Sequence, residues 1–241
     1  MPKSHSNPDQ SLVVGGLTPL TTIDYPGELA AVIFLQGCPW RCGYCQNTDL
    51  IPRDNTSSIA WQEVIDLLEK RKGLLDAVVF SGGEPTIQSS LGDAIQQVKS
   101  MGFKIGLHTA GIYPERLKKL LPLLNWIGMD IKSVKDDYQR ITGVKGSGER
   151  AWQSARLLIE SSVKHEFRTT VHPDMLNEKQ LRDLTNDLTE LGAQNYVIQE
   201  CLTEHCLDLS RRSARTPRIN TELLKNIGHN FPHFSIRQIS A

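Results

Sequence analysis

The sequence of 241 residues contains no apolar run long enough to span a bilayer, and residues 1–10 lack the apolar segment of a secretory signal. It also lacks an excess of either charge, because 27 Lys and Arg residues balance 27 Asp and Glu residues. Such a balance produces no global field that would attract nucleic acid, an anionic membrane or a strongly acidic partner. We therefore expect a cytoplasmic protein that binds neither nucleic acid nor membrane.

Cysteine is scarce as well, and three of the five cysteines lie within eight residues of one another. An odd and crowded set is not typical of an exported disulfide scaffold, in which cysteines are paired. In a reducing cytosol these side chains would stay available as thiolates.

Apolar runs of strand length alternate with amphipathic segments of helix length along most of the chain. The first run, LAAVIFLQG, is nearly continuous, as expected of a strand that is covered on both faces. The expected strands lie in 29–37, 76–85, 103–111, 126–133, 166–173 and 195–201, and the expected helices in 57–73, 91–102, 114–124, 149–163 and 177–192.

This alternation predicts an α/β fold with a parallel sheet and right-handed crossovers. Six units predict an incomplete (βα)6 barrel with its helices outside, and a doubly wound open sheet is the alternative. Both folds place their sites at the carboxyl ends of the strands. We expect one domain over 1–241, with a core at about 16–200 and an irregular C-terminal extension at about 201–241.

The stretch GCPWRCGYCQN carries Cys38, Cys42 and Cys45, spaced as Cys-x3-Cys-x2-Cys, directly after the first strand. Three sulfurs on one loop are able to converge on one ligand, and thiolates select zinc, copper(I) or an iron–sulfur cluster.

The number of cysteines favours a cluster. A closed zinc site needs four protein ligands, yet the next cysteines are Cys201 and Cys206, far along the chain. A cubane cluster on three cysteines leaves one iron open for a substrate. A zinc site completed from far away and three unrelated buried thiols are the alternatives.

The cysteine motif, with the aromatic Tyr44 just before its third cysteine, resembles the signature of the radical S-adenosylmethionine (SAM) superfamily. The longer run GLTPLTTIDYPGELAAVIFLQGCPWRCGYCQNTDLI, at 16–51, resembles the activating proteins of anaerobic ribonucleoside-triphosphate reductases and, more distantly, those of pyruvate formate-lyase. Its Asp-Tyr-Pro-Gly element is part of that likeness. The resemblance covers most of 16–200 in the order of elements.

The resemblance implies an enzyme with a [4Fe–4S] cluster on the three cysteines, whose open iron binds the amino and carboxylate groups of SAM. One electron from the cluster then cleaves SAM into methionine and a 5′-deoxyadenosyl radical, which abstracts a hydrogen atom. An anaerobic glycyl radical enzyme, with the ribonucleotide reductase favoured, is the implied partner. A flavodoxin or ferredoxin is the implied electron donor.

The second strand ends in SGGEPT, where Gly82 and Gly83 allow the backbone to approach a ligand closely. The resemblance implies that this element binds the methionine amino group of SAM, with Glu84 as a counter-charge. It also implies that Tyr44 lies near the adenine, where an aromatic face is able to stack on the purine. Taken alone, a Gly-Gly pair after a strand is an ordinary turn.

Further candidates lie at later strand ends. The period of two along a strand places Asp130 and Lys132 on one face, which suits a ligand with a ribose and a carboxylate; an ordinary ion pair is the alternative. The pair also resembles the Asp-x-Lys of glycyl-radical activating enzymes. His172, with Arg168 on the same strand face, is a candidate contact for the nucleoside. His108 stands where some relatives have Asp.

Cys201 and Cys206 form a single Cys-x4-Cys, which is weak evidence for a site. We expect them to form neither a metal site nor a redox pair.

Three functions compete. The first is an activase, either of ribonucleotide reductase or of pyruvate formate-lyase. The second is a small-molecule radical SAM enzyme, such as a 7-carboxy-7-deazaguanine synthase. The third is a non-enzymatic iron–sulfur or zinc protein. Activases with a ferredoxin-like insert need further cysteines just after the motif, and none follows here.

Overall fold

The computed structural model describes residues 12–53, 59–172, 174–212 and 219–237. Within these ranges eight strands form one sheet in the order of the chain. The strands are β1 (Val14–Thr21), β2 (Ala30–Leu35), β3 (Ala77–Gly82), β4 (Lys104–Thr109), β5 (Trp126–Asp130), β6 (Lys164–Val171), β7 (Asn195–Glu200) and β8 (His233–Arg237). Strands β2 to β8 are parallel, whereas β1 is antiparallel to β2.

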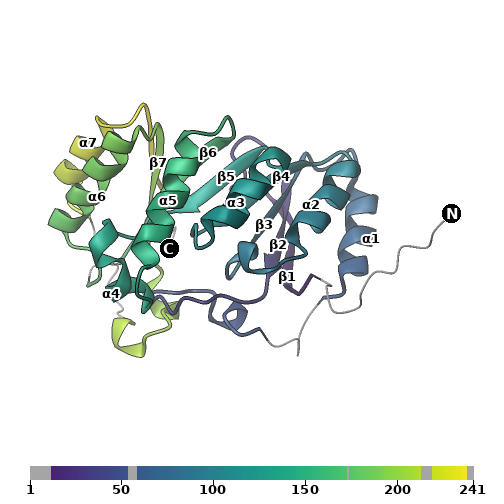
Figure 1. The fold of residues 1–241 in the computed structure, drawn as a ribbon, viewed down its shortest axis with the longest axis horizontal. Helices are drawn as coiled ribbons and strands as arrows, with labels where there is room; N and C mark the ends of the chain where they lie inside the picture. Colours follow the sequence, from purple (N-terminus) through teal and green to yellow (C-terminus); the bar gives the residue numbers. More distant parts are fainter. Residues whose placement is uncertain (1–11, 54–58, 173, 213–218, 238–241) are drawn as a thin grey trace.

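The α-helices in the described ranges are α1 (Trp61–Arg71), α2 (Leu91–Ser100), α3 (Pro114–Leu120), α4 (Tyr138–Thr142), α5 (Ser147–Ile159), α6 (Glu178–Leu191) and α7 (Thr221–Gly228). Six of these seven helices in the described ranges lie against one face of this sheet, α4 lies at its edge beside α5, and the sheet curves without pairing β1 to β8 (Figure 1). The predicted incomplete barrel, with a parallel sheet and helices outside, is confirmed. None of the helices in the described residues is long and apolar enough to cross a membrane.

The C-terminal extension is irregular over 201–212, apart from two short 3-10 helices, as predicted, whereas it forms a helix and a strand between Thr221 and Arg237, where the prediction of irregular structure was wrong. Asn220 caps α7, which buries Leu223 and Ile227, and β8 then pairs with β7. The β8 strand has only five residues, too few to show a clear apolar pattern. Its formation depends on pairing and on Phe234, whose ring stacks on Tyr196. Strand β1 was likewise absent from the predicted set.

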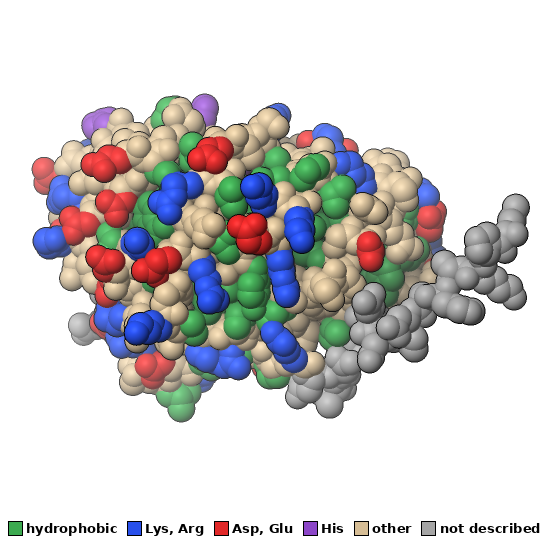
Figure 2. Space-filling model, in the orientation of Figure 1, with side chains coloured by type: hydrophobic (Ala, Val, Ile, Leu, Met, Phe, Trp, Pro, Cys, Tyr) green, Lys and Arg blue, Asp and Glu red, His purple; other side chains and the backbone are tan. Residues whose placement is uncertain are grey.

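The two faces of the sheet differ in chemistry. The face toward the helices is apolar and forms the main core, through residues such as Ile33, Phe80 and Leu107. On the concave face, Ala30 and Val32 of β2, Ala77 and Val79 of β3 and Trp126 of β5 form a small apolar cluster with Tyr25. Polar side chains occupy the same face from the end of β3 onward. On the outer face, over the helices, both signs of charge are spread (Figure 2), in keeping with the balanced composition.

The β1–β2 connection carries the Asp-Tyr-Pro-Gly element and closes the amino-terminal end of the concave face. The Tyr25 ring lies 5.2 Å from the Trp126 ring, centroid to centroid, and is almost fully buried. A Cβ atom at Gly106 would approach the Tyr25 ring to 3.0 Å, so the absence of a side chain there makes room for it. This element, which is one part of the family resemblance, therefore forms a floor beneath the barrel and does not belong to the cysteine loop.

Replacing Tyr25 with Ala should lower the free energy of unfolding by about 3 kcal/mol, because a large buried ring is removed from a packed site. Urea unfolding followed by circular dichroism measures the change. Leu20→Ala is the matched control in the same hairpin, since Leu20 is 53% exposed and its loss should cost less than about 0.5 kcal/mol. An equal decrease in the free energy of unfolding in both variants would contradict the packing role of Tyr25.

Candidate cofactor site

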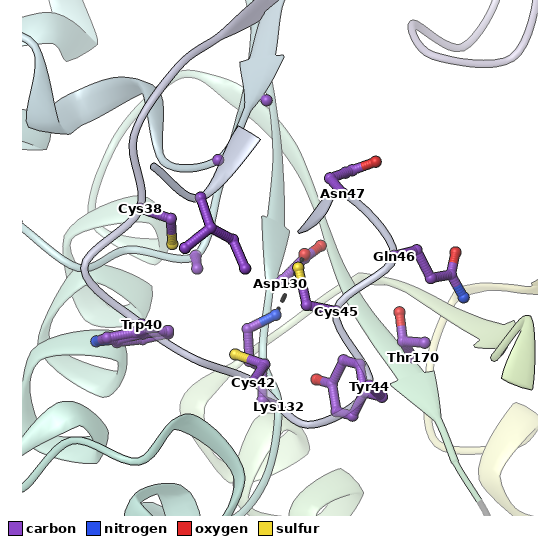
Figure 3. Close-up of a pocket in the computed structure, with 14 residues that line it drawn as sticks. Cys38, Trp40, Cys42, Tyr44, Cys45, Gln46, Asn47, Asp130, Lys132 and Thr170 are labelled. Carbon is purple, nitrogen blue, oxygen red and sulfur yellow. Dashed lines mark ion pairs between the residues drawn. The ribbon is translucent and has the colours of Figure 1, made fainter. Parts of the chain in front are cut away.

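The loop after β2 presents the three clustered cysteines at the carboxyl end of the sheet (Figure 3). Backbone hydrogen bonds from Gly37 N to Leu50 O, 2.8 Å, and from Cys38 N to Ile51 O, 3.1 Å, close the loop at its base. At its far side, Arg41 N donates to Thr142 O of α4 at 3.0 Å. The loop is thereby fixed to the body of the protein at both sides.

One pocket unites the cysteine loop with the ends of β3, β5 and β6. It is lined by Cys38, Trp40, Cys42, Tyr44, Cys45, Gln46, Asn47, Ile51, Gly82, Gly83, Ala110, Asp130, Lys132 and Thr170. All three thiols of the motif therefore face the same space, as the spacing predicts. Burial raises the pKa of Cys38 to about 12 and also raises the pKa of Cys42, where the Lys132 ammonium opposes it.

The donor set fits a cluster better than a single ion. Among the described residues, no three His, Cys, Asp or Glu side chains are grouped as one metal ion requires. Thiolates of a zinc site lie about 2.3 Å from one point, whereas the cysteines of a cubane cluster each bind a different iron. Three thiols spread around one pocket suit the larger group. A bound metal would also deprotonate these buried thiols.

Gly82, the last residue of β3, and Gly83 after it bring the end of this strand into contact with the cysteine loop. Gly82 has a φ of 120°, and a Cβ atom there would lie 2.3 Å from the backbone of Leu35. A Cβ atom on Gly83 would lie 2.5 Å from Gly37 O. Both residues line the pocket. Only glycine permits this approach, so the Gly-Gly pair has a packing role beside any ligand role.

Asp130 and Lys132 do share the pocket, with Lys132 Nζ 3.6 Å from Asp130 Oδ2. Arg168 Nε lies 3.0 Å from the other carboxylate oxygen, Oδ1. Burial would raise the pKa of Asp130, but the charges of Arg168 and Lys132 outweigh it and lower that pKa. Lys132 Nζ also lies 5.4 Å from the centre of the Tyr44 ring, a cation–π geometry. The buried Tyr44 hydroxyl has no hydrogen-bond partner in the described structure.

The sequence model of the radical SAM superfamily matches residues 32–188, which include the cysteine loop and the ends of β3, β5 and β6. The chain belongs to the radical SAM superfamily. As a radical SAM enzyme, it uses a [4Fe–4S] cluster and SAM.

Two curated relatives define its place within the superfamily. A protein of Methanocaldococcus jannaschii, provisionally named a glycyl-radical enzyme activating enzyme, is 29% identical over 86% of this chain and 88% of that protein. The pyruvate formate-lyase-activating enzyme of Clostridium pasteurianum is 30% identical over 78% of this chain and 80% of that protein. This radical SAM enzyme is thus a member of the glycyl-radical enzyme activase family, as the motif resemblance predicts.

Solved structures agree on the fold. SuiB of Streptococcus suis, bound to SAM, has a TM-score of 0.62 at 14% identity, over 85% of this chain and 48% of that chain. QueE of Escherichia coli has a TM-score of 0.55 at 15% identity, over 94% of both chains. At these identities the likeness concerns the fold alone.

Glu84 does not reach the pocket of this radical SAM enzyme. Its side chain is fully buried and accepts hydrogen bonds from Thr86 N, Thr86 Oγ1, Thr109 Oγ1 and Ala110 N, at 3.2, 2.5, 2.7 and 2.9 Å. Burial raises the pKa of the carboxyl despite these bonds. Glu84 thus fastens the end of β3 to the end of β4, and the expected counter-charge for an ammonium is not among the residues that line the pocket.

His172 is also outside the pocket. Its side chain is fully buried, Asp174 N donates to Nδ1 at 3.2 Å, and Nε2 lies 3.0 Å from Arg211 O. Since Nδ1 accepts, Nε2 carries the proton and donates to Arg211 O. The histidine connects β6 to the C-terminal extension, and Thr170, two residues earlier, is the β6 side chain that lines the pocket.

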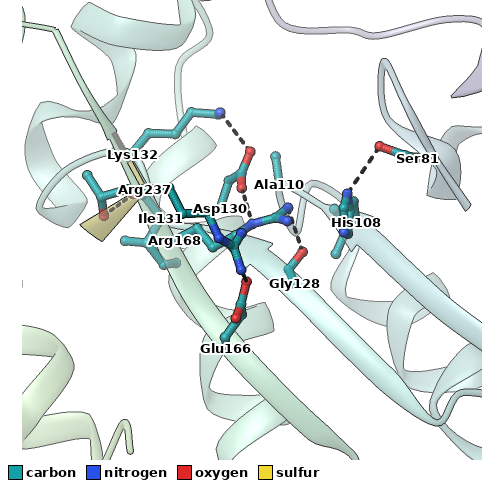
Figure 4. A network of polar contacts seen from close by, with 12 residues as sticks. Ser81, His108, Ala110, Gly128, Asp130, Ile131, Lys132, Glu166, Arg168 and Arg237 are labelled. Atoms are coloured by element: carbon teal, nitrogen blue, oxygen red, sulfur yellow. Dashed lines mark hydrogen bonds and ion pairs between the residues drawn. The ribbon is translucent and has the colours of Figure 1, made fainter. Parts of the chain in front are cut away.

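A network of polar side chains continues from the pocket along the concave face (Figure 4). Arg168 Nη2 donates to Gly128 O at 3.2 Å, and Arg237 Nη2 pairs with Glu166 Oε1 at 2.8 Å. Sequence reasoning missed Glu166 and Arg237. The period of two on β6 puts Glu166 on the face of Arg168, but Arg237 belongs to a strand that was not predicted.

His108 belongs to the same face but not to the pocket. Its Nδ1 lies 3.3 Å from Ser81 Oγ, and its Nε2 lies 2.8 Å from Asp24 O of the floor. Burial, together with the nearby Arg168 charge, lowers the pKa of His108 to about 3. The imidazole is therefore neutral at neutral pH.

The low pKa of His108 predicts a pH-dependent stability. Below pH 6.5 the unfolded chain takes up a proton at this residue that the folded chain does not, so the free energy of unfolding falls with pH down to about 3. Between pH 7.5 and 5.5 this contribution is about 1 kcal/mol. His108→Gln should remove it, measured by urea unfolding at both pH values. The exposed His233→Gln should retain the wild-type dependence, and an unchanged dependence in His108→Gln would contradict the assignment.

Proposed function

We propose that this activase forms a glycyl radical on an anaerobic ribonucleoside-triphosphate reductase. The observation that carries the proposal is the pocket in which three thiols of one loop meet Asp130 and Lys132 on the concave face of an open sheet. The likeness of the whole run 16–51, with its Asp-Tyr-Pro-Gly floor, supports this target. An open sheet suits a polypeptide substrate, because a protein loop needs a side entrance that a closed barrel lacks.

In this proposal Cys38, Cys42 and Cys45 hold the cluster. When bound, the cluster and SAM supply the radical chemistry that removes a hydrogen atom from the substrate glycine. A glycyl radical is a stable product because its flanking amide and carbonyl groups delocalise the unpaired electron.

The proposed SAM contacts come from the remaining side of the pocket. Gly82 and Gly83 offer backbone atoms, Asp130 a carboxylate held in place by Arg168, and Lys132 a cation beside it. The unpartnered hydroxyl of Tyr44 offers a donor to a ligand, and its ring a surface for the adenine. In this proposal Glu84 and His172 do not contact SAM. They hold the ends of β3 and β6 in place next to the site.

The electron donor in this proposal is a flavodoxin or ferredoxin, because iron–sulfur potentials reach down to about −700 mV and a strong one-electron reductant is needed. The cytoplasm is the proposed location, since all five cysteines are free thiols and a reducing compartment keeps them so.

The cluster assignment predicts about four irons per chain after anaerobic reconstitution with iron and sulfide. Cys42→Ala should lose nearly all of this iron, because three thiolates are the minimum for a cluster with one open iron. Cys201→Ser is the matched control and should keep it, since Cys201 is outside the motif. Iron and zinc analysis measures the outcome. Tightly bound zinc without iron uptake would show that the site is a zinc site.

The target is tested by mixing the reduced enzyme, SAM and the reductase without oxygen. We expect a protein-based doublet in electron paramagnetic resonance, together with 5′-deoxyadenosine. Replacing the reductase's radical-bearing glycine near its C-terminus with Ala should abolish the doublet, while an Ala at a neighbouring glycine that carries no radical should leave it.

Two other results would assign a different target or reaction to this enzyme. A doublet that forms only with pyruvate formate-lyase would make that enzyme the target, in line with the relative from Clostridium pasteurianum. Deoxyadenosine that forms only with a small molecule would favour the reaction class of the 7-carboxy-7-deazaguanine synthase of Thermococcus kodakarensis, which is 28% identical over 57% of this chain.

A further inference from the structure

A second pair of thiols lies beside the cysteine loop. Cys201 follows the end of β7, and Cys206 follows a short 3-10 helix at Thr203–His205. Their sulfur atoms are 3.8 Å apart. A disulfide has a sulfur–sulfur distance of about 2.05 Å, so closing this pair needs an approach of less than about 2 Å. The Cys-x4-Cys spacing alone gave no reason to expect this contact.

The segment that carries the pair is attached to the cysteine loop at two points. The side-chain nitrogen Nε2 of Gln46, next to Cys45, lies 3.5 Å from Cys201 Sγ and 3.5 Å from Leu202 O. Asp208 N donates to Gly43 O, inside the motif, at 3.0 Å. Gln46 also lines the cofactor pocket. A change at Cys201 therefore acts directly on a side chain of the pocket.

Both thiols are buried, with Cys201 2% exposed and Cys206 fully enclosed. They pack in one cluster with Tyr44, Ile141 and Met175. Because Tyr44 stands between two cysteines of the motif, this small core joins the pair to the loop through packing as well as hydrogen bonds. These surroundings hold the two sulfurs close together.

Contrary to the expectation from the sequence, we propose that Cys201 and Cys206 form an oxidisable dithiol whose oxidation changes the cofactor pocket. With a small disulfide as oxidant, one thiolate attacks the disulfide and releases a first thiol; the second thiolate then attacks the mixed disulfide and releases another. The protein loses two electrons and two protons, and the oxidant becomes two thiols. The Cys201–Cys206 disulfide withdraws the sulfur that Gln46 contacts and shifts the turn at Thr203–His205.

Disulfide formation is tested on the cluster-loaded enzyme, equilibrated without oxygen in glutathione buffers from fully reduced to fully oxidised. After unfolding, alkylation and trypsin, the peptide 183–211 contains both cysteines of the pair and no other. We expect the oxidised samples to lose the mass of two hydrogen atoms in this peptide and to resist alkylation, with their iron retained. Added dithiol should reverse the change.

Coupling to the pocket is tested by SAM binding to the same samples and by the visible circular dichroism of the cluster. Oxidation should change the SAM dissociation constant several-fold in the wild type and leave it unchanged in Cys206→Ser and in Cys201→Ser. The exposed Ser210→Ala, on the same segment, is the matched control and should behave like the wild type. Far-ultraviolet circular dichroism checks that each variant is folded.

Three results would overturn the proposal: iron loss before any disulfide forms, glutathione adducts in place of the disulfide, or a disulfide without effect on SAM binding. The mass and alkylation readouts need no activation of any partner. The disulfide can be absent while a glycyl radical still forms, or present when no radical forms. This proposal and the proposed function can therefore fail independently of each other.

Discussion

Parallel pairing of neighbouring strands is the constraint on which the rest of this enzyme depends. From β2 to β7 each strand joins the next through a helix, so all six carboxyl ends meet at one edge of the sheet. That edge gathers groups that are far apart in the chain: the motif thiols after β2, Gly82 at the end of β3, Asp130 at the end of β5 and Thr170 on β6. No local feature of these segments would bring them together.

Close backbone contact is the second condition for the site. The cysteine loop packs on the end of β3 only because Gly82 and Gly83 have no side chains. The buried Glu84 carboxylate accepts two hydrogen bonds from Thr86 of its own segment and two from the end of β4, which fasten β3 to β4. The two glycines are therefore required for packing, whether or not they also contact a ligand. A carboxylate that was expected beside the ligand instead satisfies orphaned donors in the wall, which costs less than leaving those donors buried and unpaired.

The charges of the concave face depend on one another. Arg168 neutralises Asp130 on one side and donates to Gly128 O, while Glu166, two residues before it, pairs with Arg237 of the last strand. Removal of one member would leave a partner buried without its counter-charge, which costs more than an exposed pair contributes. The C-terminal extension is therefore a structural part of the barrel, because β8 supplies one of these charges and the segment after β7 supports the cysteine loop.

The sequence by itself determined the alternation of strands and helices, the three-cysteine loop at the first strand end and the shared face of Asp130 and Lys132, because these follow from local periodicity and spacing. The tertiary structure alone decided which candidates reach the pocket. Glu84 and His172 are buried in walls by partners that lie on other strands or in the C-terminal extension. Two further features could be found only in the folded chain: the short strand β8 and the contact between Cys201 and Cys206. Strand pairing and packing create them, and neither leaves a periodic pattern in the sequence.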